Sequence, residues 1–208
     1  VGSYALFGGG NTGGSSAYYR STVVDAYNAS LSRTIPTALS VGRDGLAAAA
    51  VGNYALFAGG YRSAVSSVVD AYSASLTRST PGELSNTRVS MAAAPVGDYA
   101  LFGGGRGDRA SAVVFGGGEN NSDDRVAYVD AYNASLTRST ATNLSAARKL
   151  LAAAHVGSYA LFGGGFSMTS VVDAYDTSLT RTTIDPLSET ARNLAAASVG
   201  TYALFGGG

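Results

Sequence analysis

The sequence predicts an all-β repeat protein built from small antiparallel sheets that converge on a common axis. Residues 1–10, Val-Gly-Ser-Tyr-Ala-Leu-Phe-Gly-Gly-Gly, recur in near-copies that start at Val51, Val96, Val156 and Val199. Self-similarity at such spacings is typical of repeat architectures. Segments rich in Tyr, Phe and Val, bounded by turn residues, have the composition of short strands. The alanine runs, the best helix formers in the chain, are too short for stable helices.

The first segment of each repeat is a Tyr-Ala-Leu-Phe strand that ends in glycines. The five copies lie at 4–7, 54–57, 99–102, 159–162 and 202–205. Glycines at a strand end favour a turn with positive φ or a close approach of neighbouring backbone. A phosphate-binding loop would need a following helix and a lysine, and the sequence has neither at these places. The glycines are therefore interpreted as structural.

The second and third segments of each repeat are also predicted strands. Val-Asp-Ala-Tyr or a close variant ends at Tyr27, Tyr72, Tyr132 and Tyr175. Ser-Leu-Ser-Arg or Ser-Leu-Thr-Arg follows and leads, through a second arginine, to the alanine run. The runs occupy 47–50, 92–94, 152–154 and 195–197. Their small side chains suit an innermost strand, where radially arranged sheets leave no room for bulk.

A strand ending in Gly-Gly, a Val-Asp-Ala-Tyr strand and an arginine before a small-residue strand together resemble the kelch repeat. The resemblance covers nearly the whole chain and implies a kelch-like β-propeller, or a segment of one, with a four-stranded blade per repeat. The tryptophan usual in that family is missing, because the chain has no Trp. The tandem Tyr-Ala-Leu-Phe-Gly-Gly-Gly units are also similar to arrays in bacterial and phage-like surface proteins. This likeness favours an extracellular surface or a virion over the cytoplasm.

The strand inventory bears on domain organisation. Residues 1–208 form a single array with repeat starts at 1, 51, 96, 156 and 199 and an insertion at 106–125. The first-segment strand occurs five times and each other strand four times, so about four four-stranded blades and an extra strand pair are expected. We expect the array to be part of a larger propeller, or to be completed by another chain, with an unpaired strand edge at one terminus or both.

The composition excludes several function classes. The 14 basic and 14 acidic residues balance, so no overall field attracts nucleic acid. Without cysteine the chain has no disulfide, thiolate nucleophile or thiolate metal site. No apolar run reaches the roughly 20 residues of a membrane-spanning helix. No cofactor and no membrane insertion are predicted.

Twelve charged residues recur with the repeat and are interpreted as structural, pairing with one another or capping backbone carbonyls. They are Asp25, Asp70, Asp130 and Asp173, with Arg33, Arg78, Arg138, Arg181, Arg43, Arg88, Arg148 and Arg192. Because they are fixed to the repeat, they mark no unique active site. The alternative is an arginine ring around a central channel that binds an anion.

Candidates for catalysis and metal binding are few. His155 is the only histidine and has no serine or carboxylate at a recurrent spacing, so general base chemistry is disfavoured. Glu119, Asp123 and Asp124 supply oxygen ligands in a short acidic segment, but their spacing does not match a calcium loop. We interpret that segment as a solvated turn and predict no enzyme activity.

Binding residues are expected in the loops between the first and second strands, because these loops differ between repeats. The loop at 11–22 combines aromatic residues with an arginine. The third loop, at 106–125, contains a degenerate copy of the first strand and an Arg-Gly-Asp tripeptide. The candidate residues are Tyr18, Tyr19, Arg20, Tyr61, Arg62, Arg106, Asp108, Asn120, Asn121, Phe166 and Met168.

These observations predict a non-catalytic binding or structural module that mediates protein–protein contact or assembly, including self-association through open ends. The alternative is a lectin-like propeller in which Tyr18, Tyr19, Tyr61 and Phe166 stack on sugar rings. A kelch-type oxidase or epimerase is a distant third hypothesis.

Overall fold

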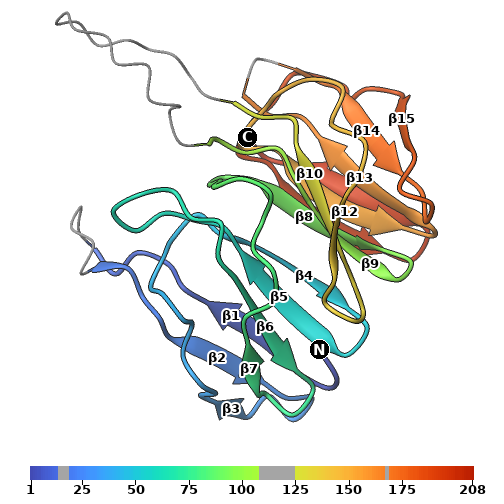
Figure 1. Cartoon of the computed structure of the whole chain (residues 1–208). Coiled ribbons are helices and arrows are strands. Elements are labelled where there is room, and N and C mark those ends of the chain that lie inside the picture. Colours follow the sequence, from blue (N-terminus) through green and yellow to red (C-terminus); the bar gives the residue numbers. More distant parts are fainter. Residues whose placement is uncertain (14–18, 108–124, 167–168) are drawn as a thin grey trace, which may run out of the picture.

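The computed structural model describes residues 1–13, 19–107, 125–166 and 169–208. Within them the chain is all-β, and its strands form five antiparallel sheets that follow one another in a curved row (Figure 1). The repeated small sheets have the blade-like arrangement of a β-propeller segment. In the described part of the chain, no helix is long and apolar enough to cross a membrane.

The five sheets, numbered 1 to 5 in chain order, contain three, four, four, four and two strands. Sheet 1 has β1 (Ala5–Gly8), β2 (Val24–Tyr27) and β3 (Arg33–Thr34). Sheet 2 has β4 (Ala47–Val51), β5 (Tyr54–Ala58), β6 (Val69–Ser73) and β7 (Arg78–Ser79). Sheet 3 has β8 (Ala92–Val96), β9 (Tyr99–Gly103), β10 (Val129–Asn133) and β11 (Arg138–Thr140). Sheet 4 has β12 (Ala152–Val156), β13 (Tyr159–Gly163), β14 (Val172–Tyr175) and β15 (Arg181–Ile184), and sheet 5 has β16 (Ala195–Val199) and β17 (Tyr202–Gly206).

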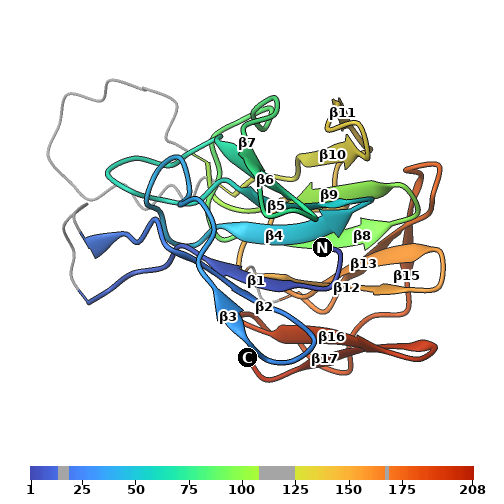
Figure 2. The same ribbon diagram turned by 90° about the horizontal axis from the view of Figure 1, so that it is seen from below.

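The alanine runs form the inner strands, as predicted. β4, β8, β12 and β16 each begin a sheet, and β4 contacts β8, β8 contacts β12, and β12 contacts β16. The view in Figure 2, turned by 90°, shows these strands between the outer parts of the sheets. The alanine runs form strands despite their high helix propensity, because the small side chain lets neighbouring sheets approach at the axis.

The predicted strand inventory is also confirmed. Three sheets are complete, and the remaining strands divide between sheet 1, which lacks an alanine strand, and sheet 5, which has only an alanine strand and a Tyr-Ala-Leu-Phe strand. β1 therefore has a free inner edge and β17 a free outer edge among the described residues. β1 and β17 are both copies of the same strand.

The glycine pair after each Tyr-Ala-Leu-Phe strand provides both a turn with positive φ and a close approach of neighbouring backbone, as Gly59 and Gly60 illustrate. Gly59 has a φ of 64°. A Cβ atom at Gly59 would lie 2.5 Å from the carbonyl oxygen of Arg88. Arg88 lies in the linker that joins the last strand of sheet 2 to the alanine strand of sheet 3. The next residue, Gly60, donates its N–H to that same carbonyl at 2.7 Å. The glycines therefore let the strand end and the linker come together.

The Ser-Leu-Ser/Thr-Arg segment forms a tight turn between the second and third outer strands. Leu136 occupies its left-handed position with a φ of 60°, and Asn133 closes the turn by accepting the N–H groups of Ser135 and Thr137 at its side chain. A left-handed leucine is strained, at a cost of roughly 1–2 kcal/mol. Its side chain is retained because it packs against the core between sheets 2 and 3.

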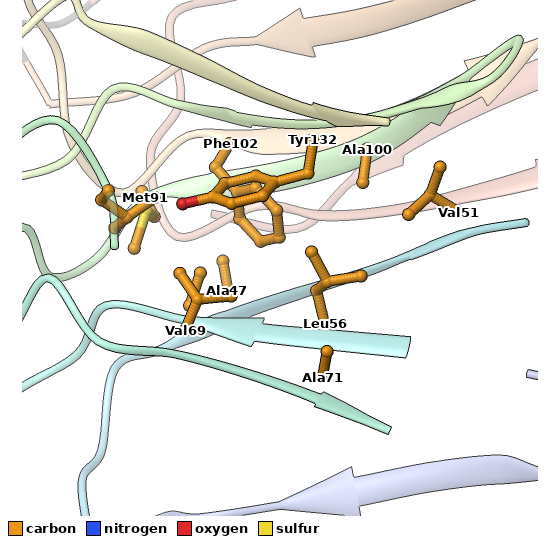
Figure 3. Close-up of a cluster of buried hydrophobic side chains, with 11 residues drawn as sticks. Ala47, Val51, Leu56, Val69, Ala71, Met91, Ala100, Phe102 and Tyr132 are labelled. Atoms are coloured by element: carbon orange, nitrogen blue, oxygen red, sulfur yellow. The ribbon is translucent and has the colours of Figure 1, made fainter. Parts of the chain in front are cut away.

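Each sheet packs one face on the opposite face of the next sheet. In Figure 3, Leu56, Val69 and Ala71 of sheet 2 lie opposite Phe102 and Tyr132 of sheet 3. The same arrangement recurs between sheets 3 and 4. Every complete sheet thus has a leucine-bearing face toward the following sheet and a phenylalanine- and tyrosine-bearing face toward the preceding one.

Candidate functional site

The recurring charges form buried clusters inside the three complete sheets. In sheet 2, Asp70 binds Arg43 through Oδ2 at 2.9 Å and Arg78 through Oδ1 at 3.0 Å. Arg43 also donates to the carbonyl oxygen of Phe57 at 3.0 Å. The linker arginine therefore joins two strands of its own sheet.

Sheets 3 and 4 repeat this cluster. Arg88 pairs with Asp130 and donates to the carbonyl oxygens of Phe102, Gly104 and Tyr128. In sheet 4, Arg148 Nη2 lies 2.8 Å from Asp173 Oδ2. Burial lowers the pKa of Arg88 and of Arg148, and the adjacent carboxylates oppose that effect. The three linker arginines are buried and form ion pairs inside their own sheets, so they do not form an anion-binding ring. They are Arg43, Arg88 and Arg148.

Arg192 differs from the arginines with which its spacing grouped it. The residue that accepts the N–H of Gly165 is Ala191, where the other sheets use Arg43, Arg88 and Arg148. Arg192 therefore does not occupy the position of Arg43, Arg88 and Arg148, and its structural role stays a prediction. One extra residue between Leu187 and Arg192 shifts the arginine by one position, and its guanidinium lies over the ring of Phe166, 4.7 Å from the centroid.

Asp25 differs from the other three recurring aspartates. Its side chain is 31% exposed, whereas those of Asp70, Asp130 and Asp173 are fully buried. Its only ion pair in the described part of the chain is to Arg33, at 3.5 Å. Among the described residues, no alanine strand pairs with β1 in sheet 1.

A cavity of about 550 Å³ lies along that inner edge. Leu6 and Asp25 line it from sheet 1, and Leu46, Ala48 and Phe57 line it from the following linker and sheet 2. A second cavity, of about 360 Å³, lies beside sheet 5 and is lined by Glu189, Arg192 and the glycines after β17. Both cavities are located where the incomplete sheets lack strands.

The outer face of sheet 1 exposes aromatic side chains that the complete sheets bury. Phe7 is 64% exposed and Tyr27 is 37% exposed. Their rings meet edge to face, 6.1 Å apart at 83°, as do those of the buried pair Phe102 and Tyr132 at 6.0 Å and 88°. Leu31, in the left-handed turn position, is 83% exposed on the same sheet. We call these three residues the Phe7 face.

The buried tyrosines contact the preceding linker through their hydroxyl groups. Tyr72, Tyr132 and Tyr175 donate to the carbonyl oxygens of Thr37, Gly82 and Thr142, each at 2.7 Å. Burial, reinforced by Asp70, raises the pKa of Tyr72 to about 12. Burial likewise raises the pKa of Tyr132 and of Tyr175.

The candidate loop residues of sheets 1 and 2 meet one another. Arg20 forms an ion pair with Asp44 at 3.0 Å and lies 5.5 Å from the ring centroid of Tyr61. Tyr19 and Arg62 remain exposed. Because a cation covers one face of Tyr61, this ring is less open for sugar stacking than the loop hypothesis requires.

A second set of basic residues surrounds Phe166. Besides Arg192, the guanidinium of Arg125 and the amine of Lys149 lie 5.7 and 5.0 Å from its ring centroid. Arg106 is half-buried and forms β-bridges with Val89 and Arg125. The candidates Tyr18, Asp108, Asn120, Asn121 and Met168 lie outside the described residues, as do the weak calcium candidates Glu119, Asp123 and Asp124.

His155 has a serine neighbour that sequence spacing did not reveal. The Oγ of Ser198 lies 3.1 Å from His155 Nδ1, because the two residues occupy the same position of adjacent alanine strands. That hydroxyl donates to the carbonyl oxygen of His155 at 2.6 Å and accepts its N–H at 3.2 Å. Ser198 is thus engaged with backbone and joins β12 to β16.

Among the described residues, no three His, Cys, Asp or Glu side chains form a group suited to a metal ion.

No known protein family matches the chain, and no curated protein matches it either.

Proposed function

We propose that this chain is a non-catalytic, kelch-like β-propeller module that mediates protein–protein contact or assembly through the exposed faces of its terminal sheets. The Phe7 face is the observation that supports this most directly. The counterparts of its phenylalanine and tyrosine in the complete sheets are buried against a neighbouring sheet, and the counterparts of Leu31 are half-buried there. Contiguous exposed apolar surface of this kind is typical of interaction sites, and we place the module on a cell surface or virion by its likeness to tandem surface arrays.

The lectin alternative is weaker on the described residues. Of its four stacking residues, Tyr61 and Phe166 already have cations over their rings. Aromatic rings engaged in this way contribute to packing within the loops. Protein contact through the Phe7 face needs no rearrangement of these loops.

Light scattering of the purified chain, read beside a glycan array, tests the proposal. We expect the weight-average mass to rise with concentration above the 20.9 kDa of one chain. A Phe7→Asp substitution should abolish this rise, because it places a charge on the contact face. Tyr128→Asp, at an exposed aromatic residue just before β10, is the matched control and should leave the association unchanged. Sugar binding by a monodisperse monomer would contradict the proposal.

A further inference from the structure

The loop side of sheets 1 and 2 has a group of side chains whose charges cancel. Arg20, from the loop of sheet 1, forms a β-bridge with Asn11 and lies over the ring of Tyr61 in sheet 2. Asp44, in the linker before sheet 2, forms a β-bridge with Tyr61 and an ion pair with Arg20 at 3.0 Å. Val89 has the place of Asp44 in the linker before sheet 3. We call these five residues the Tyr61 cluster.

The loop side of sheets 3 and 4 has the same arrangement built from other residues. Arg106 forms a β-bridge with Arg125, and Lys149 forms one with Phe166. The guanidinium of Arg125 lies 5.7 Å from the ring centroid of Phe166, and the amine of Lys149 lies 5.0 Å from it. Arg192, in the linker before sheet 5, adds a third cation at 4.7 Å. We call these five residues the Phe166 cluster.

The two clusters correspond position by position and differ in charge. The corresponding pairs are Asn11 and Arg106, Arg20 and Arg125, Asp44 and Lys149, Tyr61 and Phe166, and Val89 and Arg192. The Tyr61 cluster has one arginine and one aspartate, whereas the Phe166 cluster has three arginines and one lysine. A lysine thus stands beside the loop arginine in the second cluster, where the first cluster has an aspartate.

The repeat does not dictate these charges. Asp44, Val89, Lys149 and Arg192 each follow the linker residue whose carbonyl oxygen accepts an N–H from the glycines of the preceding sheet. An acidic, an aliphatic and two basic side chains all fit at this one backbone position. Positions that vary on a constant frame are where binding specificity is usually located. The positive charge of the Phe166 cluster is therefore a property of this site and not of the fold.

The cations of the Phe166 cluster are held close together by the backbone and by the ring. Arg125 Nη1 donates to the carbonyl oxygen of Phe166 at 3.5 Å, and Phe166 donates its N–H to the carbonyl oxygen of Lys149 at 2.7 Å. Arg106 exchanges two backbone hydrogen bonds with Val89. Like charges held in this way repel one another, and the negative face of the ring offsets part of that repulsion. An anion bound beside the ring would reduce it further.

The chemistry of the cluster fits an acidic peptide. Guanidinium groups bind carboxylates through two parallel hydrogen bonds. The cations come from sheet 3, from the linker before sheet 4 and from the linker before sheet 5, so they suit an extended ligand with several negative charges. Arg192 is exposed, and Arg106, Arg125 and Lys149 are half-buried, so all four can be reached from solvent. A sugar is less well suited, because cations already lie over the ring on which it would stack.

We infer that the Phe166 cluster binds an acidic segment of a partner protein, with aspartate or glutamate carboxylates paired to its arginine and lysine side chains. The inference goes beyond the proposed function, because it adds a second contact surface that is separate from the Phe7 face. The contact is electrostatic and partly exposed to solvent, so its strength falls as the ionic strength rises.

Fluorescence anisotropy with a labelled hexaglutamate peptide tests the inference. The full chain is titrated into the peptide at about 0.01 M and at about 0.15 M salt, where the screening length falls about threefold. We expect saturable binding at the lower salt and binding weaker by roughly tenfold at the higher salt. A hexaglutamine peptide of the same length, which has no side-chain charge, should not bind.

Two substitutions locate the binding in the cluster. The double variant Lys149→Gln/Arg192→Gln removes two of the four cations and leaves the backbone bridges in place, so we expect hexaglutamate to bind about tenfold more weakly. Lys149→Arg keeps the charge and should keep the binding. Arg33→Gln, at an arginine of sheet 1 whose side chain is 55% exposed, is the matched control and should bind like the unchanged chain.

The outcomes separate the inference from the proposed function. Equal affinity of the double variant and the unchanged chain for hexaglutamate would overturn the site. A sulfated oligosaccharide that binds the cluster when hexaglutamate does not would overturn the acidic peptide as the ligand. Absence of binding to either probe at low salt would overturn both the site and the ligand. In each case light scattering still decides on association through the Phe7 face, which involves none of the substituted residues.

Discussion

Sheets 1 and 3 have the same side chains in different surroundings. The Phe7–Tyr27 and Phe102–Tyr132 pairs have nearly the same edge-to-face geometry, yet the first is exposed and the second is buried. Asp25 and Asp130 differ in the same way. Ring geometry is therefore a property of a single sheet, whereas burial and full charge pairing require a neighbouring sheet and an inner strand.

The largest expected effect comes from the buried charge cluster. Asp130→Ala should lower the free energy of unfolding by about 5 kcal/mol, because it leaves Arg88 buried without its carboxylate. Asp25→Ala removes only a partly exposed pair with Arg33, so the loss should be at most about 1 kcal/mol. Chemical denaturation of the two variants measures the difference. Similar losses would show that sheet 1 holds its aspartate as tightly as sheet 3.

The next effect separates the two phenylalanines. Phe102→Ala should cost about 4 kcal/mol, because it opens a cavity in the core between sheets 2 and 3. Phe7→Ala should change the stability of the monomer by no more than about 0.5 kcal/mol, since the ring is mostly exposed. Dilute samples are needed for this denaturation series, so that association does not protect Phe7. A large loss at Phe7 under those conditions would mean that its face is covered.

The smallest effect concerns the tyrosine hydroxyls and depends on pH. Tyr72→Phe should cost about 1 kcal/mol near neutral pH through the lost bond to Thr37. Because the folded pKa of Tyr72 is raised to about 12 from the usual 10, this stabilisation is complete below pH 10 and is lost as the pH rises toward 12. The wild-type and Tyr72→Phe unfolding energies should therefore converge over that range. Tyr27→Phe is the control, and a pH-independent gap at Tyr72 would contradict the assignment.

Much of the fold was predictable because the copies of the repeat can be compared with one another. Five copies of Tyr-Ala-Leu-Phe fixed the strand inventory, and the alanine runs were correctly placed at the inner edge. The shift of the arginine in the fourth repeat is visible in the sequence, because Arg192 follows Leu187 by five positions whereas Arg148 follows Leu144 by four. The hydrogen bond from Gly165 to Ala191 shows its structural consequence.

The candidate site was less predictable, because its features depend on contacts between segments distant in sequence. The Ser198–His155 contact joins residues 43 positions apart. The cation over Tyr61 comes from Arg20, in another loop. The Phe7 face has the same sequence as faces that are buried, so no residue pattern marks it as exposed.

By itself the sequence determined the strands, their order and the small inner side chains, because these follow from local composition and from repetition. The tertiary structure decided which copies of each repeated residue are buried and which of the charged copies are fully paired. The burial of each repeated phenylalanine, aspartate and left-handed leucine depends on an adjacent sheet or strand. Among the described residues, sheet 1 has three strands and sheet 5 has two. Among the described residues, the same side chains are therefore buried in the complete sheets and more exposed in sheets 1 and 5.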